Sequence, residues 1–162
     1  MQVQVVVSNF RELTILAYAA GIIDGEGCIS ITKNRAIQKG AVASHYHALR
    51  IEVSVCDKKV IDFFYENFGG ARTAKARPNH KPYYKWAITS AAAEKFLKTI
   101  YPYLVGKIDQ ADLAFAFRKS FSSSRSRGHR LISTETNNER EEYHRAMMAL
   151  KQSNYNAALI PF

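Results

Sequence analysis

Two acidic residues that alternate with glycines are the clearest candidates for chemistry in this chain. Asp24 and Glu26 are followed by Gly25 and Gly27, respectively. Glycine frees the backbone to turn and leaves its carbonyl groups bare, and carboxylate plus carbonyl oxygen is a natural ligand set for Mg²⁺ or Ca²⁺. These four residues therefore predict a hard-cation site. Taken alone, they also fit a glycine helix cap with two solvated acids.

A helix should carry these acids at its C-terminal end. Apolar residues from Leu13 to Ile23 recur every three or four positions, and Asn9 with Glu12 forms a plausible N-terminal capping box. At the C-terminal end a carboxylate meets the negative pole of the helix dipole, which costs roughly 0.3–1 kcal/mol per charge. We therefore expect a positive group to compensate the two acids.

The end of this helix also resembles a known signature. Residues 19–27, Ala-Ala-Gly-Ile-Ile-Asp-Gly-Glu-Gly, are similar to the nonapeptide of the LAGLIDADG homing endonucleases, with Glu26 at the penultimate acidic position. Residues 102–111, PYLVGKIDQA, are similar to that family's second landmark, a P-Φ-L-x-x-K-x-x-Q-A run that enters a later helix. The resemblance covers roughly residues 10–118 and leaves the C-terminal third without support.

The resemblance implies a metal-dependent nuclease. Glu26 would hold Mg²⁺ with the Gly25 carbonyl beside it, and Lys107 would contact the active-site water or phosphate. Mn²⁺ is the alternative ion, Ca²⁺ is expected to bind without turnover, and no small-molecule cofactor is expected. Asp57 stands where related single-motif enzymes often have Gln; it could position water, join the metal shell or merely cap a helix. The predicted catalytic residues are Glu26, Lys107 and Asp57, while Asp24 is expected to cap the turn or the partner helix.

The resemblance also implies a homodimer that cuts both strands of a long double-stranded DNA target, in association with an intron or an intein. The two signature helices would pack at the two-fold axis. One side of this helix carries almost no side chains, which would let a second helix approach closely. The predicted dimer contact consists of Ala17, Ala20 and Gly21. A non-cleaving nucleic-acid binder of the same fold, either an intron RNA maturase or a DNA-binding regulator, is the alternative.

The rest of the chain should form a sheet with helices behind it. Alternation of apolar and polar residues predicts strands at 29–32, 49–56, 73–77 and 85–88. Helices are expected at 57–68, 90–104, 107–118 and 133–151, while residues 1–7 should be a short extension or an edge strand. The order helix-strand-strand-helix-strand-strand-helix predicts an α+β fold, a four-stranded antiparallel sheet with helices on one face and a DNA-binding saddle on the other.

The second face of this sheet would be polar and basic with few acids, which favours a ligand surface over ordinary solvent exposure. The predicted DNA-binding residues are Ser30, Thr32, Asn34, Arg35, Arg50, Glu52, Ser54, Thr73, Lys75, Arg77 and Lys85. We expect His45 and His47 at the surface or on DNA, because no Cys or His follows them at zinc-like spacing. Trp86 and the tyrosines are interpreted as core residues, and Cys28 and Cys56 as packing residues.

Length and charge agree with this interpretation. The 162 residues suit one domain, and a net charge of +9 with a pI near 9.6 favours a polyanionic partner. Two cysteines without metal or disulfide spacing favour a reduced intracellular setting, cytoplasmic or organellar, and no membrane span is expected. We divide the chain into an endonuclease-like core (1–118), a basic Ser-rich loop (119–130) and a C-terminal helical extension (131–162).

Overall fold

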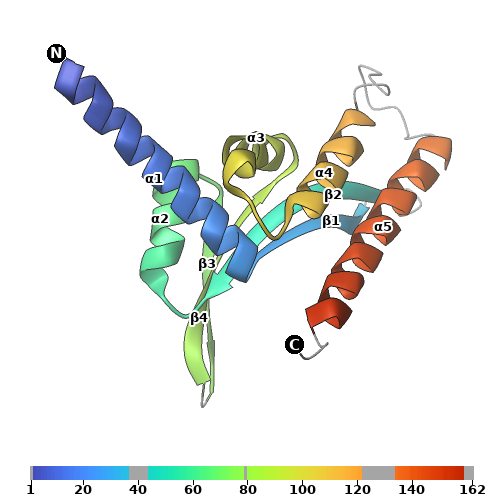
Figure 1. Cartoon of the computed structure of the whole chain (residues 1–162). Coiled ribbons are helices and arrows are strands. Elements are labelled where there is room, and N and C mark those ends of the chain that lie inside the picture. Colours follow the sequence, from blue (N-terminus) through green and yellow to red (C-terminus); the bar gives the residue numbers. More distant parts are fainter. Residues whose placement is uncertain (1, 37–43, 79, 122–133, 159–162) are drawn as a thin grey trace. The chain divides into compact units, whose positions relative to one another are not determined.

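The computed structural model describes residues 2–36, 44–78, 80–121 and 134–158 (Figure 1). The elements, in chain order, are α1 (Gln2–Glu26), β1 (Gly27–Ala36), β2 (Ser44–Val55), α2 (Lys58–Phe68), β3 (Ala71–Arg77), β4 (His80–Thr89), α3 (Ser90–Ile100), the 3₁₀ turn η1 (Tyr101–Tyr103), α4 (Ile108–Lys119) and α5 (Thr134–Ala158). The predicted order of helices and strands is therefore confirmed. No helix in the described part of the chain is long and apolar enough to cross a membrane.

The four strands form one antiparallel sheet in the order β1-β2-β4-β3, so β1 and β3 are its edges. This confirms the predicted α+β fold with a four-stranded antiparallel sheet. In the second hairpin, Thr73 lies opposite Lys85 and Lys75 opposite Tyr83, with an irregularity before Arg77. Alternation sets the buried side of β2, where Leu49, Ile51 and Val53 are fully buried.

The chain divides into two compact units, each with its own buried side chains. The first unit comprises residues 1–28 and 51–108. Its core contains an aromatic cluster in which the Trp86 ring lies 4.8 Å from Phe64 and 5.2 Å from Phe96, between ring centroids. The Trp86 indole N–H donates a hydrogen bond of 2.6 Å to the Gly69 carbonyl, so the predicted core role of Trp86 is confirmed.

The second unit comprises residues 29–50 and 109–162. Within it, Ile29 and Ile31 of β1, Phe117 of α4 and Met147 of α5 are buried. α4 and α5 contact each other through Phe117 and Tyr143, whose ring centroids are 6.0 Å apart. The division of the chain at residues 118 and 130 stays a prediction, since residues 122–133 lie outside the described residues.

The local signals at α2 behave as expected from the sequence. Asp57 has an extended backbone and its side chain accepts a hydrogen bond from the Lys59 N–H, which makes it the N-cap. The helix ends at Gly69, whose φ of 69° lies in the region that glycine tolerates best. A Cβ at Gly70 would lie 2.7 Å from the Ala87 carbonyl oxygen, so a side chain is excluded there.

Three expectations about local structure are wrong. α1 begins at Gln2, so residues 1–7 are not an edge strand and Asn9 lies inside the helix rather than at a capping box. Strand propensity of valine is a weak signal, and an existing helix gains one hydrogen bond for each residue it adds. The helix predicted for 90–104 instead ends at Ile100 and continues as η1, which contains Pro102.

The expected burial also fails for several side chains. Tyr18, Tyr46 and Tyr65 are exposed, as is Cys56, whereas Cys28 is half-buried. A tyrosine combines an apolar ring with a hydroxyl that water can satisfy, so it is stable at the margin of a core. Tyr18 illustrates this, because its ring packs edge-on against Phe63 of α2 at 4.9 Å while part of it remains in solvent.

Candidate active site

The C-terminal end of α1 presents the predicted catalytic acid to solvent. α1 continues through Gly25, ends at Glu26, and β1 follows at once with Gly27. Gly25 and Glu26 are both exposed. The alternative of a glycine helix cap is not seen here: among the described residues, only Gly69 and Gly70 are glycines with a positive φ. The acid therefore extends from a regular helix end, at the negative pole of the dipole.

Gly27 is required by a close approach rather than by its φ angle. A Cβ at this position would lie 2.6 Å from the Ile23 Cα and 2.7 Å from the Ile23 carbonyl oxygen. Ile23 is fully buried, so the last turn of α1 cannot easily move aside. A Cβ at Gly25, by contrast, would meet no atom within 4 Å. The two glycines beside Glu26 thus serve different purposes.

Asp24 connects the end of α1 to the second landmark of the sequence. Its carboxylate accepts hydrogen bonds from the backbone N–H of Val105, at 2.7 Å, and of Lys107, at 3.0 Å. Hydrogen bonds from N–H groups to a carboxylate are among the stronger ones in proteins. The structural role expected for Asp24 is confirmed, and the segment that it caps is the loop before α4 of its own chain.

Lys107 supplies the positive charge that the end of α1 needs. Its ammonium group donates a hydrogen bond to the backbone carbonyl of Asp24, in the last turn of α1. A cation at the C-terminus of a helix is favoured by the dipole. The first and second landmarks, which are about eighty residues apart in sequence, therefore meet at one point. Both predicted catalytic groups, Glu26 and Lys107, belong to this helix end.

Asp57 acts as the N-cap of α2, with Oδ1 accepting the Lys59 N–H at 2.9 Å. This supports the structural alternative that the sequence left open. A second role for Asp57 in catalysis stays a prediction, as does the role of Glu26 and Lys107. In the described part of the chain, no three His, Cys, Asp or Glu side chains converge on a common point.

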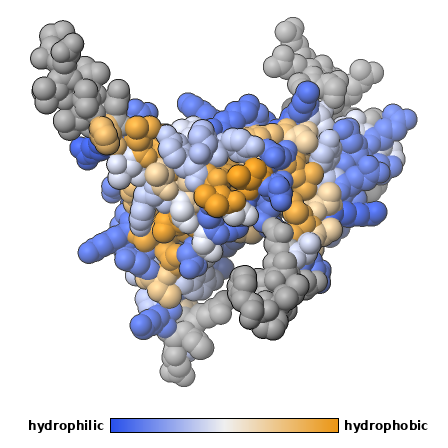
Figure 2. Space-filling model, in the orientation of Figure 1, coloured by the Kyte–Doolittle hydropathy of each residue, from blue (hydrophilic) through white to orange (hydrophobic). Residues whose placement is uncertain are grey.

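The small-residue face of α1 is only partly available to another molecule. Ala17 and Gly21 are exposed, and a Cβ on Gly21 would meet nothing within 4 Å. Ala20 is fully buried by its own chain, so its assignment to the dimer contact is wrong. Three-residue spacing places Ala20 one step around the helix from Ala17, toward the core. Phe10 and Leu13 extend the exposed stripe, and Figure 2 shows hydrophobic residues at the surface along α1.

The predicted DNA-binding residues of the second unit lie on the first hairpin. The Ser30 hydroxyl donates to the Arg50 carbonyl at 3.2 Å, and the Thr32 hydroxyl donates to the Ala48 carbonyl at 3.1 Å. Asn34 donates from its side-chain amide to the Thr32 hydroxyl at 3.0 Å. Ser30, Thr32 and Asn34 are half-buried. Arg35, like them, belongs to β1, and it is exposed.

The predicted DNA-binding residues of the first unit lie on β2, β3 and β4. Thr73, Lys75 and Ser54 are exposed. Lys85 and Glu52 form an ion pair of 2.9 Å, so part of the Lys85 charge is neutralised by the protein itself. The side chain of Arg77 lies outside the described residues, although its backbone belongs to β3.

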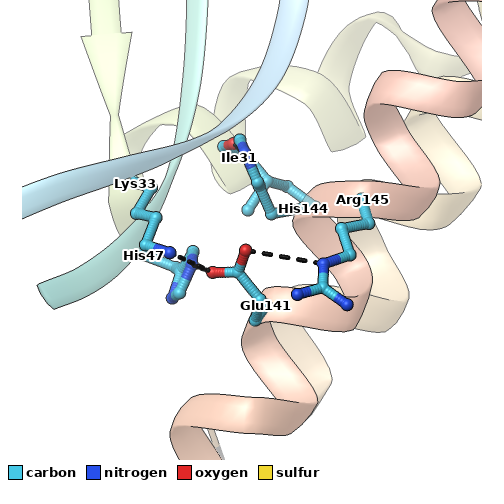
Figure 3. A network of polar contacts seen from close by, with 6 residues as sticks. All are labelled: Ile31, Lys33, His47, Glu141, His144 and Arg145. Carbon is cyan, nitrogen blue, oxygen red and sulfur yellow. Dashed lines mark hydrogen bonds and ion pairs between the residues drawn. The ribbon is translucent and has the colours of Figure 1, made fainter.

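Sequence reasoning missed a polar cluster on the C-terminal helix (Figure 3). His47 is not at the surface but 2% exposed, and its Nε2 lies 3.0 Å from the Glu141 carboxylate of α5. Burial lowers the pKa of His47, while hydrogen bonds from Lys33 and His47 lower the pKa of Glu141 to about 2. The alternation of β2 could have predicted that His47 is buried, because His47 lies on the same face of the strand as Leu49. His45 is exposed, as expected.

A sequence model described as LAGLIDADG endonuclease matches residues 19–108, which is more than half of the chain, and the chain belongs to this family. No match was found among curated proteins.

Several solved structures share the fold. The homing endonuclease I-CvuI in complex with the I-CreI target has 16% identity and a TM-score of 0.56, covering 85% of this chain and 97% of that one. The archaeal intron-encoded homing endonuclease I-Vdi141I, complexed with DNA, has 15% identity and a TM-score of 0.53, covering 84% and 98%. I-SmaMI bound to cleaved DNA has 10% identity and a TM-score of 0.59, with 80% of this chain matching 42% of that one.

Proposed function

We propose that this chain is a site-specific, divalent-metal-dependent homing endonuclease, associated with an intron or intein, that hydrolyses both strands of a long double-stranded DNA target as a homodimer. The observation that carries the proposal is the end of α1. There an exposed acid of the family signature, Glu26, lies two residues after Asp24, which holds Lys107 from the second family landmark. Family membership and the shared fold support DNA as the substrate.

The donor groups at this helix end suit a hard divalent cation. Glu26 offers an exposed carboxylate, and the exposed Gly25 offers its backbone carbonyl. Mg²⁺ is commonly held by one or two carboxylates together with water and substrate phosphates, so a single acid from each chain fits it. Mn²⁺ would serve in its place, whereas Ca²⁺ would bind without turnover. When bound, the ion would supply Lewis-acid stabilisation of the attacking and leaving oxygens.

The remaining chemistry falls to this chain's own side chains. Lys107, held at the negative pole of α1, would offset the charge that develops on the scissile phosphate. Asp24 would keep Lys107 in place by fixing two backbone N–H groups of its loop. Asp57 would orient water if its carboxylate has a function beyond the cap of α2. The Glu26 carboxylate would repel phosphate in the absence of a cation, which makes cleavage depend on the ion.

The requirement for two cuts supports a homodimer. One chain carries one signature acid, and cutting two strands needs two such acids held close to each other. The exposed stripe of α1 that contains Ala17 and Gly21 is the proposed subunit contact. Small residues there would let the two α1 helices approach closely and bring both Glu26 carboxylates together.

The polar residues of the strands would contact the phosphates and the base edges of the DNA. Lysine and arginine would neutralise phosphates, while Thr, Asn and Arg side chains would read base edges in the major groove. The proposed contacts are Ser30, Thr32, Asn34, Arg35, Arg50, Glu52, Ser54, Thr73, Lys75, Arg77 and Lys85.

The proposal is tested by incubating the purified protein with a randomised double-stranded DNA library in Mg²⁺ and sequencing the cut ends. We expect one long consensus site, cut on both strands, and no cutting in EDTA. Ca²⁺ in place of Mg²⁺ should give bound but uncut DNA. Selection of a consensus by binding, without any cut in Mg²⁺ or Mn²⁺, would favour the non-cleaving nucleic-acid binder instead.

A further inference from the structure

The C-terminal helix α5 makes polar contacts with both strands of the first hairpin (Figure 3). Glu141 of α5 lies 2.8 Å from the Lys33 ammonium of β1 and 3.0 Å from the His47 Nε2 of β2. Almost one turn later, the His144 Nδ1 lies 2.6 Å from the Ile31 carbonyl and therefore donates a hydrogen bond to it. α5 thus holds β1 at two points and β2 at one.

The contact at Ile31 acts on the edge of the sheet. β1 has one neighbouring strand, β2, so part of its main-chain groups have no strand partner. An open edge is able to bend or to pair with another chain unless another element covers it. His144 supplies a partner for the Ile31 carbonyl. α5 therefore supplies a main-chain partner at one point of this edge strand.

His47 makes its hydrogen bond to Glu141, and its ring also lies 5.9 Å from the His144 ring, between centroids. His47 is buried, and within the described part of the chain its Nδ1 has no hydrogen-bond partner. In the neutral ring that burial favours, the proton must be on Nε2 to be donated to the Glu141 carboxylate, and this leaves Nδ1 as an unprotonated acceptor. A hydrogen bond to a charged carboxylate is roughly twice as strong as one to a neutral oxygen, so loss of the Glu141 charge alone weakens the hold on His47. Glu141 consequently fixes the His47 ring and the stretch of β2 that carries it.

The residues that α5 holds alternate with the proposed DNA-reading residues. In a strand, neighbouring side chains point to opposite faces. Thr32 lies between Ile31 and Lys33, both of which α5 contacts, and its hydroxyl reaches the Ala48 carbonyl next to His47. The orientation of Thr32 and of Asn34, which bonds to it, is therefore set by a backbone that α5 fixes from the other side.

We propose that Glu141 and His144 are positioning residues for DNA recognition, which hold the β1–β2 hairpin in the geometry that reads base pairs. Both residues lie outside the segment 19–108 that matches the family. The inference rests on the proposed function, because it requires that this hairpin contacts DNA. It assigns to α5 a role in specificity, although neither side chain belongs to the polar face itself.

The test compares Glu141→Gln with Glu142→Gln. Both variants remove one negative charge from the same turn of α5, and Glu142 is exposed, so general electrostatic attraction to DNA changes equally in the two. Sites are selected by wild type from a randomised duplex library. Base pairs read by the first hairpin are then mapped with Thr32→Val and Asn34→Ala, and base pairs read by the second hairpin with Lys75→Ala.

We expect Glu141→Gln to lose about tenfold in discrimination at the base pairs mapped to Thr32 and Asn34, the size of one base contact. Discrimination at base pairs mapped to Lys75 should be unchanged, and Glu142→Gln should match wild type at both sets. Equal profiles for the two variants, or a loss spread over all base pairs, would overturn the inference. Absence of any consensus for wild type would overturn the proposed function and this inference with it.

Amide hydrogen exchange on the DNA-free protein keeps the test independent of cleavage and of general folding. Glu141→Gln should raise exchange in residues 29–36 and 45–50 about tenfold over Glu142→Gln, with β3 and β4 unchanged. His144→Asn retains a donor near the Nδ1 position and should preserve both protection and discrimination, whereas His144→Leu should lose both. The positioning role would be contradicted if β1 stayed protected from exchange in Glu141→Gln. It would also be contradicted if His144→Asn and His144→Leu gave the same protection and discrimination.

Discussion

Replacing Gly27 by alanine tests how the signature helix passes into the first strand. An alanine Cβ would lie 2.6 Å from the Ile23 Cα, 2.7 Å from its carbonyl oxygen and 2.9 Å from its Cδ1. Two of these atoms are backbone, and the Ile23 side chain is fully buried, so the last turn of α1 has to shift. Overpacking of this kind costs about 1–3 kcal/mol of unfolding free energy.

This cost converts into a measurable change in melting temperature. For a chain of this size, 1 kcal/mol corresponds to about 2–4 °C, so Gly27→Ala should melt roughly 2–12 °C below wild type. Gly25→Ala is the matched control, since Gly25 is exposed, helical and without any atom within 4 Å of a Cβ. Alanine there should raise stability by about 1 kcal/mol, because it is the better helix former.

Differential scanning calorimetry and urea unfolding of the three proteins provide the assay. The expected order of stability is Gly25→Ala, then wild type, then Gly27→Ala. If Gly27→Ala is as stable as wild type, the close approach between Gly27 and Ile23 is wrong. If Gly25→Ala is less stable than wild type, the exposure of Gly25 is wrong.

Three further predictions follow from the same contacts. Asp24→Asn leaves one acceptor for the two N–H groups of Val105 and Lys107, and it should lower the free energy of unfolding in urea by about 1.5–3 kcal/mol. The control Asp109→Asn, at an exposed residue in the first turn of α4, should lower it by less than about 1 kcal/mol. Equal losses in the two variants would contradict the Asp24 contact. Acid should weaken the second unit in two steps that circular dichroism can follow. The pKa of His47 is lowered from 6.5, so its contribution to stability is lost as pH falls below 6.5, whereas the contribution of Glu141 is lost as pH falls from 4.5 toward about 2. Glu141→Gln should abolish the lower step, and a lower step that persists in this variant would refute the assignment. Gly21→Leu should leave the single chain folded, since a Cβ there meets no atom of its own chain within 4 Å, and it should block dimer formation as measured by light scattering. An unchanged dimer mass, or a monomeric wild type with full activity, would refute the α1 contact.

Much of the fold could be predicted because its signals are local. Alternation identified the strands, Asp57 and Gly69 marked both ends of α2, and Asp24 was expected to be structural. Electrostatics predicted that a positive group compensates the acids at the end of α1, and the Lys107 ammonium lies there.

The features that sequence could not supply depend on tertiary packing. Periodicity gives the angle between Ala17 and Ala20 around the helix, but it does not decide which of them the core covers. His47 and Glu141 are 94 positions apart, and neither residue indicates the other. Their pairing arises only because α5 lies against the first hairpin, and α5 belongs to the part of the chain that the family resemblance did not include.

Glu26→Gln tests the central claim most directly. The substitution keeps size and hydrogen bonding but removes the charge that would hold the cation. Cleavage of the selected site in Mg²⁺ should fall by several orders of magnitude, while binding measured in EDTA should remain or tighten, because an anion that faces phosphates is gone. Cleavage by Glu26→Gln at the wild-type rate in Mg²⁺ would contradict the account, since the exposed acid at the end of α1 would then have no part in the reaction.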